Sequence, residues 1–162
     1  MLIISNTSPL LYLHQTSHLD LLRKLYGQVH VPTAVAAELA VGADLGIAVP
    51  TTTQYPWLSL LQVQHPEILP LVTDLGAGET EAIACALEHP GSLLILDDQL
   101  GRRIAHANGL RITGTLGVIP KARQEGLIGS VAPVIEQLRA AGLWISDALA
   151  ADVVATAGDN DR

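Results

Sequence analysis

The chain of 162 residues is poor in aromatic side chains, with two Trp, three Tyr and no Phe. Its hydrophobic core therefore has to be packed mainly from Leu, Ile, Val and Ala. The chain has a single cysteine, Cys85, which excludes both a disulfide framework and a thiolate metal site. Cys85 lies in a predicted helix. We expect Cys85 to be a buried structural thiol and the protein to be cytoplasmic.

Long apolar runs are also missing from the sequence. The longest apolar stretches are of strand length and are broken by Pro, Gly or a charged residue, and the start at Met1-Leu2-Ile3-Ile4 has no basic region. We therefore expect neither a signal peptide nor a membrane span. A chain of this length fits one domain, expected over residues 1–157, with a flexible C-terminal tail at 158–162.

Basic residues are scarce as well, and the net charge is -7. This balance argues against a protein that coats nucleic acid by bulk electrostatic attraction. The distribution is uneven, because residues 102–123 contain five basic residues and no acid. That stretch is either a local basic patch or a solvated helix face. Arg102 and Arg103 begin it and are candidates for steering a phosphate backbone.

Strand and helix signals alternate along the chain, which predicts right-handed parallel crossovers. Strands are expected at 2–4, 29–31, 93–96 and 111–113, with a short further strand at 58–63 inside a variable stretch from 42 to 70. Helices are expected to begin at Leu10 and to cover 19–26, 33–39, 78–87, 99–107, 116–123, 131–141 and 147–157, the last capped by Ser146. The predicted fold class is α/β, with a short parallel sheet flanked by helices.

Two adjacent carboxylates, Asp97 and Asp98, follow the apolar run Leu93-Leu94-Ile95-Leu96. Four aliphatic residues in a row predict a strand buried on both faces, so the acids lie at its carboxyl end, where open α/β sheets bind ligands. Paired carboxylates repel each other there unless a cation is bound or one of them caps a helix. Asp98 directly precedes a predicted helix and is a candidate for its N-cap.

Other polar side chains are expected near the same edge of the sheet. Asn6 follows the first strand, Glu38 lies on an early helix, and Glu79 and Glu81 begin the helix before the central strand. Taken singly, Asn6 can be a turn residue, Glu38 a boundary residue, and the other two can complement the helix dipole. Together with the two aspartates they predict a site for Mg²⁺ or Mn²⁺, which prefer carboxylate and carbonyl oxygen.

The helical period separates Glu79 from Glu81. At about 100° per residue, Glu79 lies within the apolar sector of its helix, whereas Glu81 lies beside Glu88 on the opposite side. We therefore expect Glu79 to face the sheet and Glu81 to face water, which makes Glu79 the stronger ligand candidate.

Motifs of several other chemistries are absent from the sequence. It has no Gly-x-Ser-x-Gly elbow, no two-histidine helical metal motif and no Gly-Lys-Ser/Thr phosphate loop. Gly76-Ala77-Gly78 resembles half of a dinucleotide loop but lacks the third glycine. The Asp nucleophile that a haloacid-dehalogenase-like enzyme needs after the first strand is also missing.

A series of short motifs covers nearly the whole chain, among them Gly76-Ala77-Gly78-Glu79-Thr80-Glu81 and Leu96-Asp97-Asp98. The stretches in question are 4–10, 31–39, 76–84, 96–105, 113–117 and 142–146. In this order they resemble the PIN domain, a small magnesium-dependent ribonuclease fold found in VapC-like toxins of prokaryotic toxin-antitoxin pairs. The resemblance is to a bacterial subgroup long labelled only as a domain of unknown function.

The resemblance implies a short parallel sheet with four acidic positions meeting at the carboxyl ends of the strands. Carried over to this chain, these positions are Asn6, Glu38, Glu79 and either Asp97 or Asp98. We prefer Asp98 because of its spacing to the following helix alanine, with Asp97 in support. The resemblance also implies Mg²⁺- or Mn²⁺-dependent cleavage of RNA, a homodimer, and a small antitoxin protein that neutralises the site.

Asn6 departs from the family pattern, because PIN nucleases usually have Asp at this position. An amide can coordinate a metal through its carbonyl oxygen, but it contributes no charge and should weaken metal binding. One alternative is therefore a catalytically silent PIN-like module that binds RNA or a protein without cutting. A weaker alternative is a phosphatase or another small-substrate hydrolase that uses the same acids.

Overall fold

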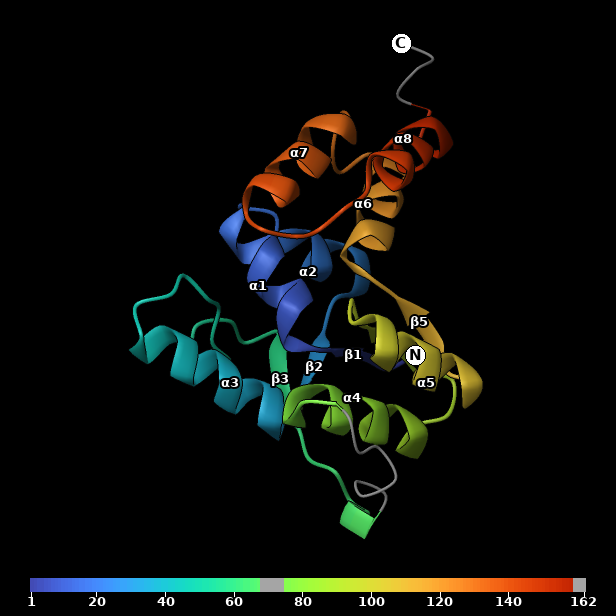
Figure 1. Cartoon of the computed structure of the whole chain (residues 1–162). Helices are drawn as coiled ribbons and strands as arrows, with labels where there is room; N and C mark the ends of the chain where they lie inside the picture. Colours follow the sequence, from blue (N-terminus) through green and yellow to red (C-terminus); the bar gives the residue numbers. More distant parts are fainter. Residues whose placement is uncertain (68–74, 159–162) are drawn as a thin grey trace.

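The computed structural model describes residues 1–67 and 75–158 and shows one parallel sheet flanked by helices (Figure 1). The five strands lie in the order β3-β2-β1-β4-β5, and every neighbouring pair is parallel. They are β1 (Ile3–Ser5), β2 (Val29–Pro32), β3 (Leu58–Leu61), β4 (Leu93–Ile95) and β5 (Arg111–Thr113). The predicted α/β class and parallel sheet are therefore confirmed.

The helices follow the predicted order, and two of their ends differ from the predicted bounds by more than one residue. They are α1 (Thr7–Gln15), α2 (Asp20–Tyr26), α3 (Thr33–Asp44), α4 (Ala77–Glu88), α5 (Gln99–Ala107), α6 (Thr115–Gln124), α7 (Ala132–Ala140) and α8 (Asp147–Thr156). The prediction that the first helix begins at Leu10 is wrong: it begins at Thr7, because Pro9 is tolerated in a first turn, where its missing N–H has no intrahelical partner. No helix in the described part of the chain is long and apolar enough to cross a bilayer.

The stretch expected to be variable contributes the edge strand of the sheet. β3 pairs with β2 from Val29 opposite Leu58 to Pro32 opposite Leu61, so a short strand forms within the predicted range 58–63. α3 continues past its predicted end at Leu39 to Asp44. The flexible tail expected at 158–162 falls, apart from Gly158, outside the described residues, and so do residues 68–70 of the variable stretch.

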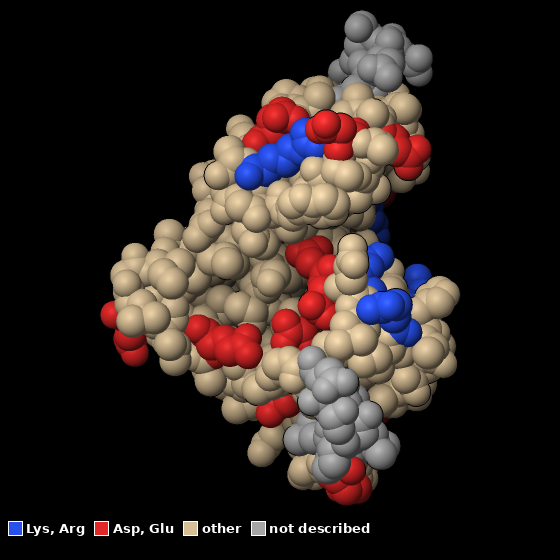
Figure 2. Space-filling model, in the orientation of Figure 1, with Lys and Arg blue, Asp and Glu red and all other residues tan. Residues whose placement is uncertain are grey.

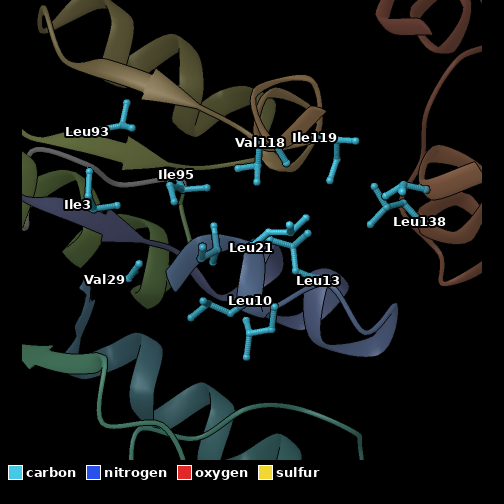
Figure 3. Close-up of a cluster of buried hydrophobic side chains, with 14 of the residues drawn as sticks. Ile3, Leu10, Leu13, Leu21, Val29, Leu93, Ile95, Val118, Ile119 and Leu138 are labelled. Carbon is cyan, nitrogen blue, oxygen red and sulfur yellow. The ribbon is translucent and has the colours of Figure 1, made fainter. Parts of the chain in front are cut away.

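Two apolar clusters cover the two faces of the sheet. On one face, Ile3 and Ile95 pack against side chains from α1, α2, α6 and α7 (Figure 3). On the other face, Ile4 and Leu94 pack against α4 and α5. Because side chains alternate along a strand, this two-sided burial accounts for the uninterrupted aliphatic run in β4.

Cys85 lies in the second cluster and is fully buried. Burial, with the nearby charges of Glu88 and Glu81 adding to it, raises the pKa of the Cys85 thiol to about 12. The thiol therefore stays protonated at neutral pH, which confirms the expectation of a structural cysteine.

The strand order places a topological switch point between β1 and β4. From β1 the chain moves outward to β2 and β3, and it then returns to β4 on the other side of β1. Ser5 pairs with Ile95, so the residues that follow the two strands, Asn6 and Leu96, lie side by side. The carboxyl ends of strands at such a point form the crevice in which α/β sheets bind ligands.

Candidate active site

Asn6 is the first residue after β1 and lies at the switch point. Its backbone N–H donates to the carbonyl oxygen of Ile95 at 3.0 Å, which ties it to the end of β4. The residue is 1% exposed, and its buried Oδ1 accepts a hydrogen bond from none of the described residues. Leaving a buried acceptor unpaired costs about 1–3 kcal/mol, so this oxygen is an exception that calls for an explanation.

The carboxylate of Glu38 is held between the N-terminal ends of two helices. Thr7, the first residue of α1, donates its Oγ1 proton to Oε2 of Glu38, and the backbone N–H of Gly78 in α4 donates to Oε1 at 3.0 Å. Helix N-termini carry partial positive charge, which favours a carboxylate at this point. Thr7 directly follows Asn6, so the carboxylate of Glu38 is tied to the residue next to the one that carries the unpaired amide oxygen.

Two glycines make room for the acids at the start of α4. A Cβ on Gly78 would lie 2.6 Å and 2.8 Å from the two carboxylate oxygens of Glu38. A Cβ on Gly76 would lie 2.6 Å from Oε2 of Glu79. The Gly76-Ala77-Gly78 sequence therefore serves close approach of carboxylates to the backbone, which the comparison with a dinucleotide loop did not anticipate.

Glu79 and Glu81 have different surroundings. Glu79 is half-buried in the first turn of α4, and its carboxylate accepts no hydrogen bond from the described residues. Oε1 of Glu81 accepts a hydrogen bond from the backbone N–H of Ala34 at 2.8 Å and so satisfies the first turn of α3. The expectation that Glu81 faces water is wrong, because α3 packs beside α4 and covers that side. We call Asn6, Thr7, Glu38, Gly78 and Glu79 the acid crevice.

The two aspartates after β4 each contact a helix N-terminus. Oδ2 of Asp98 accepts from the backbone N–H of Gly101 at 2.7 Å, which confirms Asp98 as the N-cap of α5. Oδ1 of Asp97 accepts from the backbone N–H of Thr115 at 2.7 Å, and Oδ2 accepts from its hydroxyl at 2.6 Å. Asp97 thus fastens the end of β4 to the start of α6. Since a carboxylate has about four acceptor positions, both aspartates keep capacity for a further ligand.

The acids surround a hollow on one face of the molecule. Figure 2 shows Asp and Glu side chains around it, over α3 and the N-terminal ends of α4 and α5, with Lys and Arg side chains beside them over α5. Within residues 1–67 and 75–158, no three His, Cys, Asp or Glu side chains are close enough together to hold a metal ion. An ion in the hollow would need the Asn6 oxygen and water besides the carboxylates, a ligand set that suits Mg²⁺.

A family profile described as a PIN domain matches residues 2–159. The chain belongs to the PIN-domain family. PIN domains are generally nucleases that bind nucleic acid and use divalent metal ions, which agrees with oxygen ligands at the switch point. Neither a search of curated proteins nor a search of solved structures gave a significant match.

This PIN domain also has a cleft that the sequence did not predict. It lies beside Asp97, between β5, the start of α6 and the segment that joins α7 to α8, and its volume is about 360 Å³. We call it the Trp144 cleft. Its lining residues are Asp97, Gln99, Arg102, Ile112, Thr113, Gly114, Leu116, Gly117, Leu143, Trp144 and Leu149. The one signal in the sequence was a Trp between Leu143 and Ile145 in a chain with few aromatic residues.

The two arginines predicted to steer a phosphate backbone are not equivalent. Nη1 of Arg102 donates to the carbonyl oxygen of Leu96 at 2.8 Å, which holds the guanidinium at the wall of the Trp144 cleft. Arg103 is exposed and shares with Arg102 and Gln99 an adjoining shallow depression. Arg102 is therefore the better placed of the two.

Proposed function

We propose that this PIN domain is a metal-dependent endoribonuclease of the toxin-antitoxin type, which hydrolyses RNA phosphodiester bonds. The observation that carries the proposal is the buried, unpaired Oδ1 of Asn6 at the switch point of the sheet. Glu38 is held by hydrogen bonds from Thr7, the residue after Asn6, and from Gly78, and these bonds fix the direction of its carboxylate. A neutral acceptor and an oriented carboxylate at this place fit a hard divalent cation.

Asn6, Glu38, Glu79 and Asp98 are the proposed ligand positions for Mg²⁺ or Mn²⁺, with Asp97 in support. Because no three of the described acidic side chains are close enough together to hold one ion, the Asn6 oxygen and water would have to complete the coordination beside at most two of these carboxylates. Such an ion, when bound, supplies positive charge for phosphodiester oxygens and lowers the pKa of water. The chain itself provides orientation: the helix N-termini of α1 and α4 fix Glu38, and the capping bond to Gly101 fixes Asp98. Arg102 provides a fixed cation for the phosphate backbone next to the acids.

The proposal includes partners. The family resemblance suggests a cytoplasmic homodimer and a small antitoxin protein that covers the acid crevice. A partner that inhibits in this way must lower the access of RNA to Glu38 and Glu79. Co-expression with such a partner should abolish RNA cleavage by the wild-type protein, and removal of the partner should restore it. This result would support this part of the proposal.

A catalytically silent PIN-like module is the second candidate. Two observations favour it: Asn6 contributes no charge, and no three of the described acidic, imidazole or thiolate side chains are close enough to hold an ion. Such a module would bind RNA or a protein at the same edge of the sheet without hydrolysis.

The two candidates are separated by cleavage of a mixed RNA pool with purified protein and Mn²⁺. The informative variants are Glu79→Gln and Asp98→Asn, because Asn is as good an N-cap as Asp and keeps α5 intact while removing the charge. Glu136→Gln on the exposed side of α7 is the matched control. We expect EDTA and both site variants to abolish cleavage and the control to cleave like the wild type.

Each other result has a definite meaning. Full activity of both site variants would contradict the ligand assignment. No cleavage by the wild type with any divalent metal would favour the silent module. Hydrolysis of a small phosphate ester without cleavage of RNA would instead indicate a phosphatase that uses the same acids.

A further inference from the structure

Trp144 is exposed in a chain that has few aromatic side chains. Of the two Trp residues, Trp57 is half-buried and packs against Tyr55, with ring centroids 5.9 Å apart. Trp144 is 79% exposed, although an indole is the side chain that gains most from burial. Leu149, which lines the same cleft, is 43% exposed. A flat aromatic face is therefore open to solvent next to further apolar surface.

The cleft beside Trp144 has the size and lining of a small-ligand site. Its volume of about 360 Å³ falls in the range of about 300–1,000 Å³ that such sites occupy. The lining combines apolar side chains with the polar Gln99 and Thr113 and with the charged Asp97 and Arg102. The cleft can thus hold a flat group with polar edges.

Charge complementarity comes from Arg102. One of its guanidinium nitrogens is used on the carbonyl oxygen of Leu96, and the remaining donors are available to an anion. Arg103, on the same helix, adds positive charge in the adjoining depression. A cation beside a stacking face is the combination that single-stranded nucleic acid binds, with the base on the ring and the phosphate on the cation.

The cleft shares Asp97 with the proposed active site. Asp97 forms part of its wall, and both carboxylate oxygens of Asp97 are fixed by Thr115 at the start of α6. The carboxyl ends of β4 and β5 meet here, so a ligand in the cleft lies along the same edge of the sheet as the acid crevice. In Figure 1, the segment that joins α7 to α8 crosses the front of the molecule on the side of α6.

We propose that the Trp144 cleft is a subsite for one nucleobase of single-stranded RNA, which stacks on the Trp144 indole while a neighbouring phosphate contacts Arg102. The proposal rests on the proposed function for its ligand class. The proposal gives the segment between α7 and α8, which carries Trp144, a part in substrate binding that is separate from the proposed metal ligands. A protein surface that covers Trp144 is the competing occupant, and the affinity and sedimentation measurements below distinguish it from RNA.

The test uses the fluorescence of Trp144 itself. In Trp57→Phe, Trp144 is the only Trp, so its emission reports directly on the cleft. The full-length variant is titrated, without divalent metal, with a 2′-O-methyl oligoribonucleotide of mixed sequence, which resists cleavage. We expect quenching of Trp144 emission that saturates. Trp144→Phe, which keeps Trp57 alone, should bind the same oligonucleotide with no comparable quenching.

Affinity then separates stacking from apolar contact. Trp144→Leu keeps apolar surface and removes the aromatic face, and it should weaken binding by about 5- to 150-fold, the range for loss of one stacked base. Trp144→Phe should lose less, because a smaller ring still stacks. Leu45→Ser, at an apolar side chain that is 73% exposed elsewhere on the surface, is the control and should bind like the wild type. Because Trp144 is exposed, its variants should keep the wild-type melting temperature.

The results that overturn the subsite differ from those that overturn the nuclease. Unchanged affinity in Trp144→Leu together with no quenching in Trp57→Phe overturns the subsite, even if the wild type cleaves RNA. A loss of dimers in Trp144→Leu, seen by sedimentation with unchanged RNA affinity, overturns it in favour of a protein contact. Quenching and a Trp144-dependent affinity without cleavage support the subsite and contradict only the nuclease.

Discussion

The acid crevice and the Trp144 cleft lie along one edge of the sheet but are built in different ways. In the crevice, backbone N–H groups and a threonine hydroxyl hold Glu38, glycines make room for the carboxylates, and a buried amide oxygen is left unpaired. In the cleft, an exposed indole and a fixed guanidinium face solvent. Asp97, which supports the proposed metal ligands, also lines the cleft. The comparison suggests a division between chemistry on one side and substrate binding on the other.

The division has a kinetic consequence. Changes in the crevice should alter turnover and metal dependence, whereas changes in the cleft should alter the affinity for RNA. Each of the four variants below tests that separation.

Glu38→Gln should have the largest effect. The substitution removes the charge of an oriented carboxylate and leaves a side chain of the same size between Thr7 and Gly78. We expect kcat for RNA cleavage in Mn²⁺ to fall about 100-fold or more, at least the effect of losing an outer-shell partner of a metal ligand. RNA affinity, measured without metal, should stay the same. Asp44→Asn at the exposed end of α3 is the control, and an unchanged kcat in Glu38→Gln would contradict the role of Glu38.

Asn6→Asp should strengthen metal binding, because it adds a charge where the crevice has a neutral oxygen. We expect about tenfold tighter Mn²⁺ binding, since affinity at such sites follows the charge of the ligands. In EDTA the new carboxylate, buried and unpaired, should lower the melting temperature. Excess Mn²⁺ should restore it, because a ligand that binds only the folded state stabilises that state.

The melting temperatures of the wild type and of Asn6→Asp, each measured with EDTA and with Mn²⁺, test this prediction without an activity assay. If the melting temperature of Asn6→Asp is no more sensitive to Mn²⁺ than that of the wild type, Asn6 does not face a metal site.

Gly78→Ala should have an intermediate effect on activity and a small effect on stability. The new Cβ would lie 2.6 Å from an oxygen of Glu38, so the flexible carboxylate has to move away. We expect kcat to fall about tenfold, the lower end of the range for a misplaced ligand shell. The free energy of unfolding should change by less than about 1 kcal/mol, because Ala is the better helix former.

Gly42→Ala is the matched control on α3, where a Cβ would lie at an ordinary 3.4 Å from Val49. It should keep full activity. Equal activity in the two variants would mean that the position of Glu38 does not matter.

Arg102→Gln should have the smallest effect, and it should appear in binding rather than in turnover. Loss of one phosphate contact weakens RNA binding a few-fold and lowers the slope of log affinity against log salt by about 0.7 for a single strand. Arg103→Gln should change the slope less, because Arg103 is exposed and lies outside the cleft. Equal slopes in the two variants would contradict the special placement of Arg102.

Elements with clear signals at both ends were predicted closely. The helix at Gln99–Ala107 and the strand at Arg111–Thr113 have the predicted bounds, because Asp98 caps the helix and Asn108-Gly109 ends it. Ser146 caps α8 as expected, accepting from the backbone N–H of Leu149 at 3.1 Å. The ends of α1 and α3 were misjudged, since Pro9 allows an earlier start and no breaker follows Leu39 directly.

The residue types of the candidate site were predictable, but their contacts were not. Helical period distinguished Glu79 from Glu81, but it gave no sign that Glu81 would bond to α3 rather than face water. The capping role of Asp98 was open to prediction because it is local. The two hydrogen bonds from Thr115 to Asp97 could not be predicted, because they join the end of β4 to the start of α6.

By itself, the sequence determined the α/β class, the parallel sheet and the edge at which the acids collect, because hydrophobic runs, periods and caps act over a few residues. The tertiary structure alone decided which groups meet there. It brought Thr7 and Gly78 to Glu38, left Asn6 with an unpaired oxygen, and placed Trp144 beside Arg102. These contacts join residues far apart in the chain, and they depend on the packing of whole helices on the sheet, which no local pattern contains.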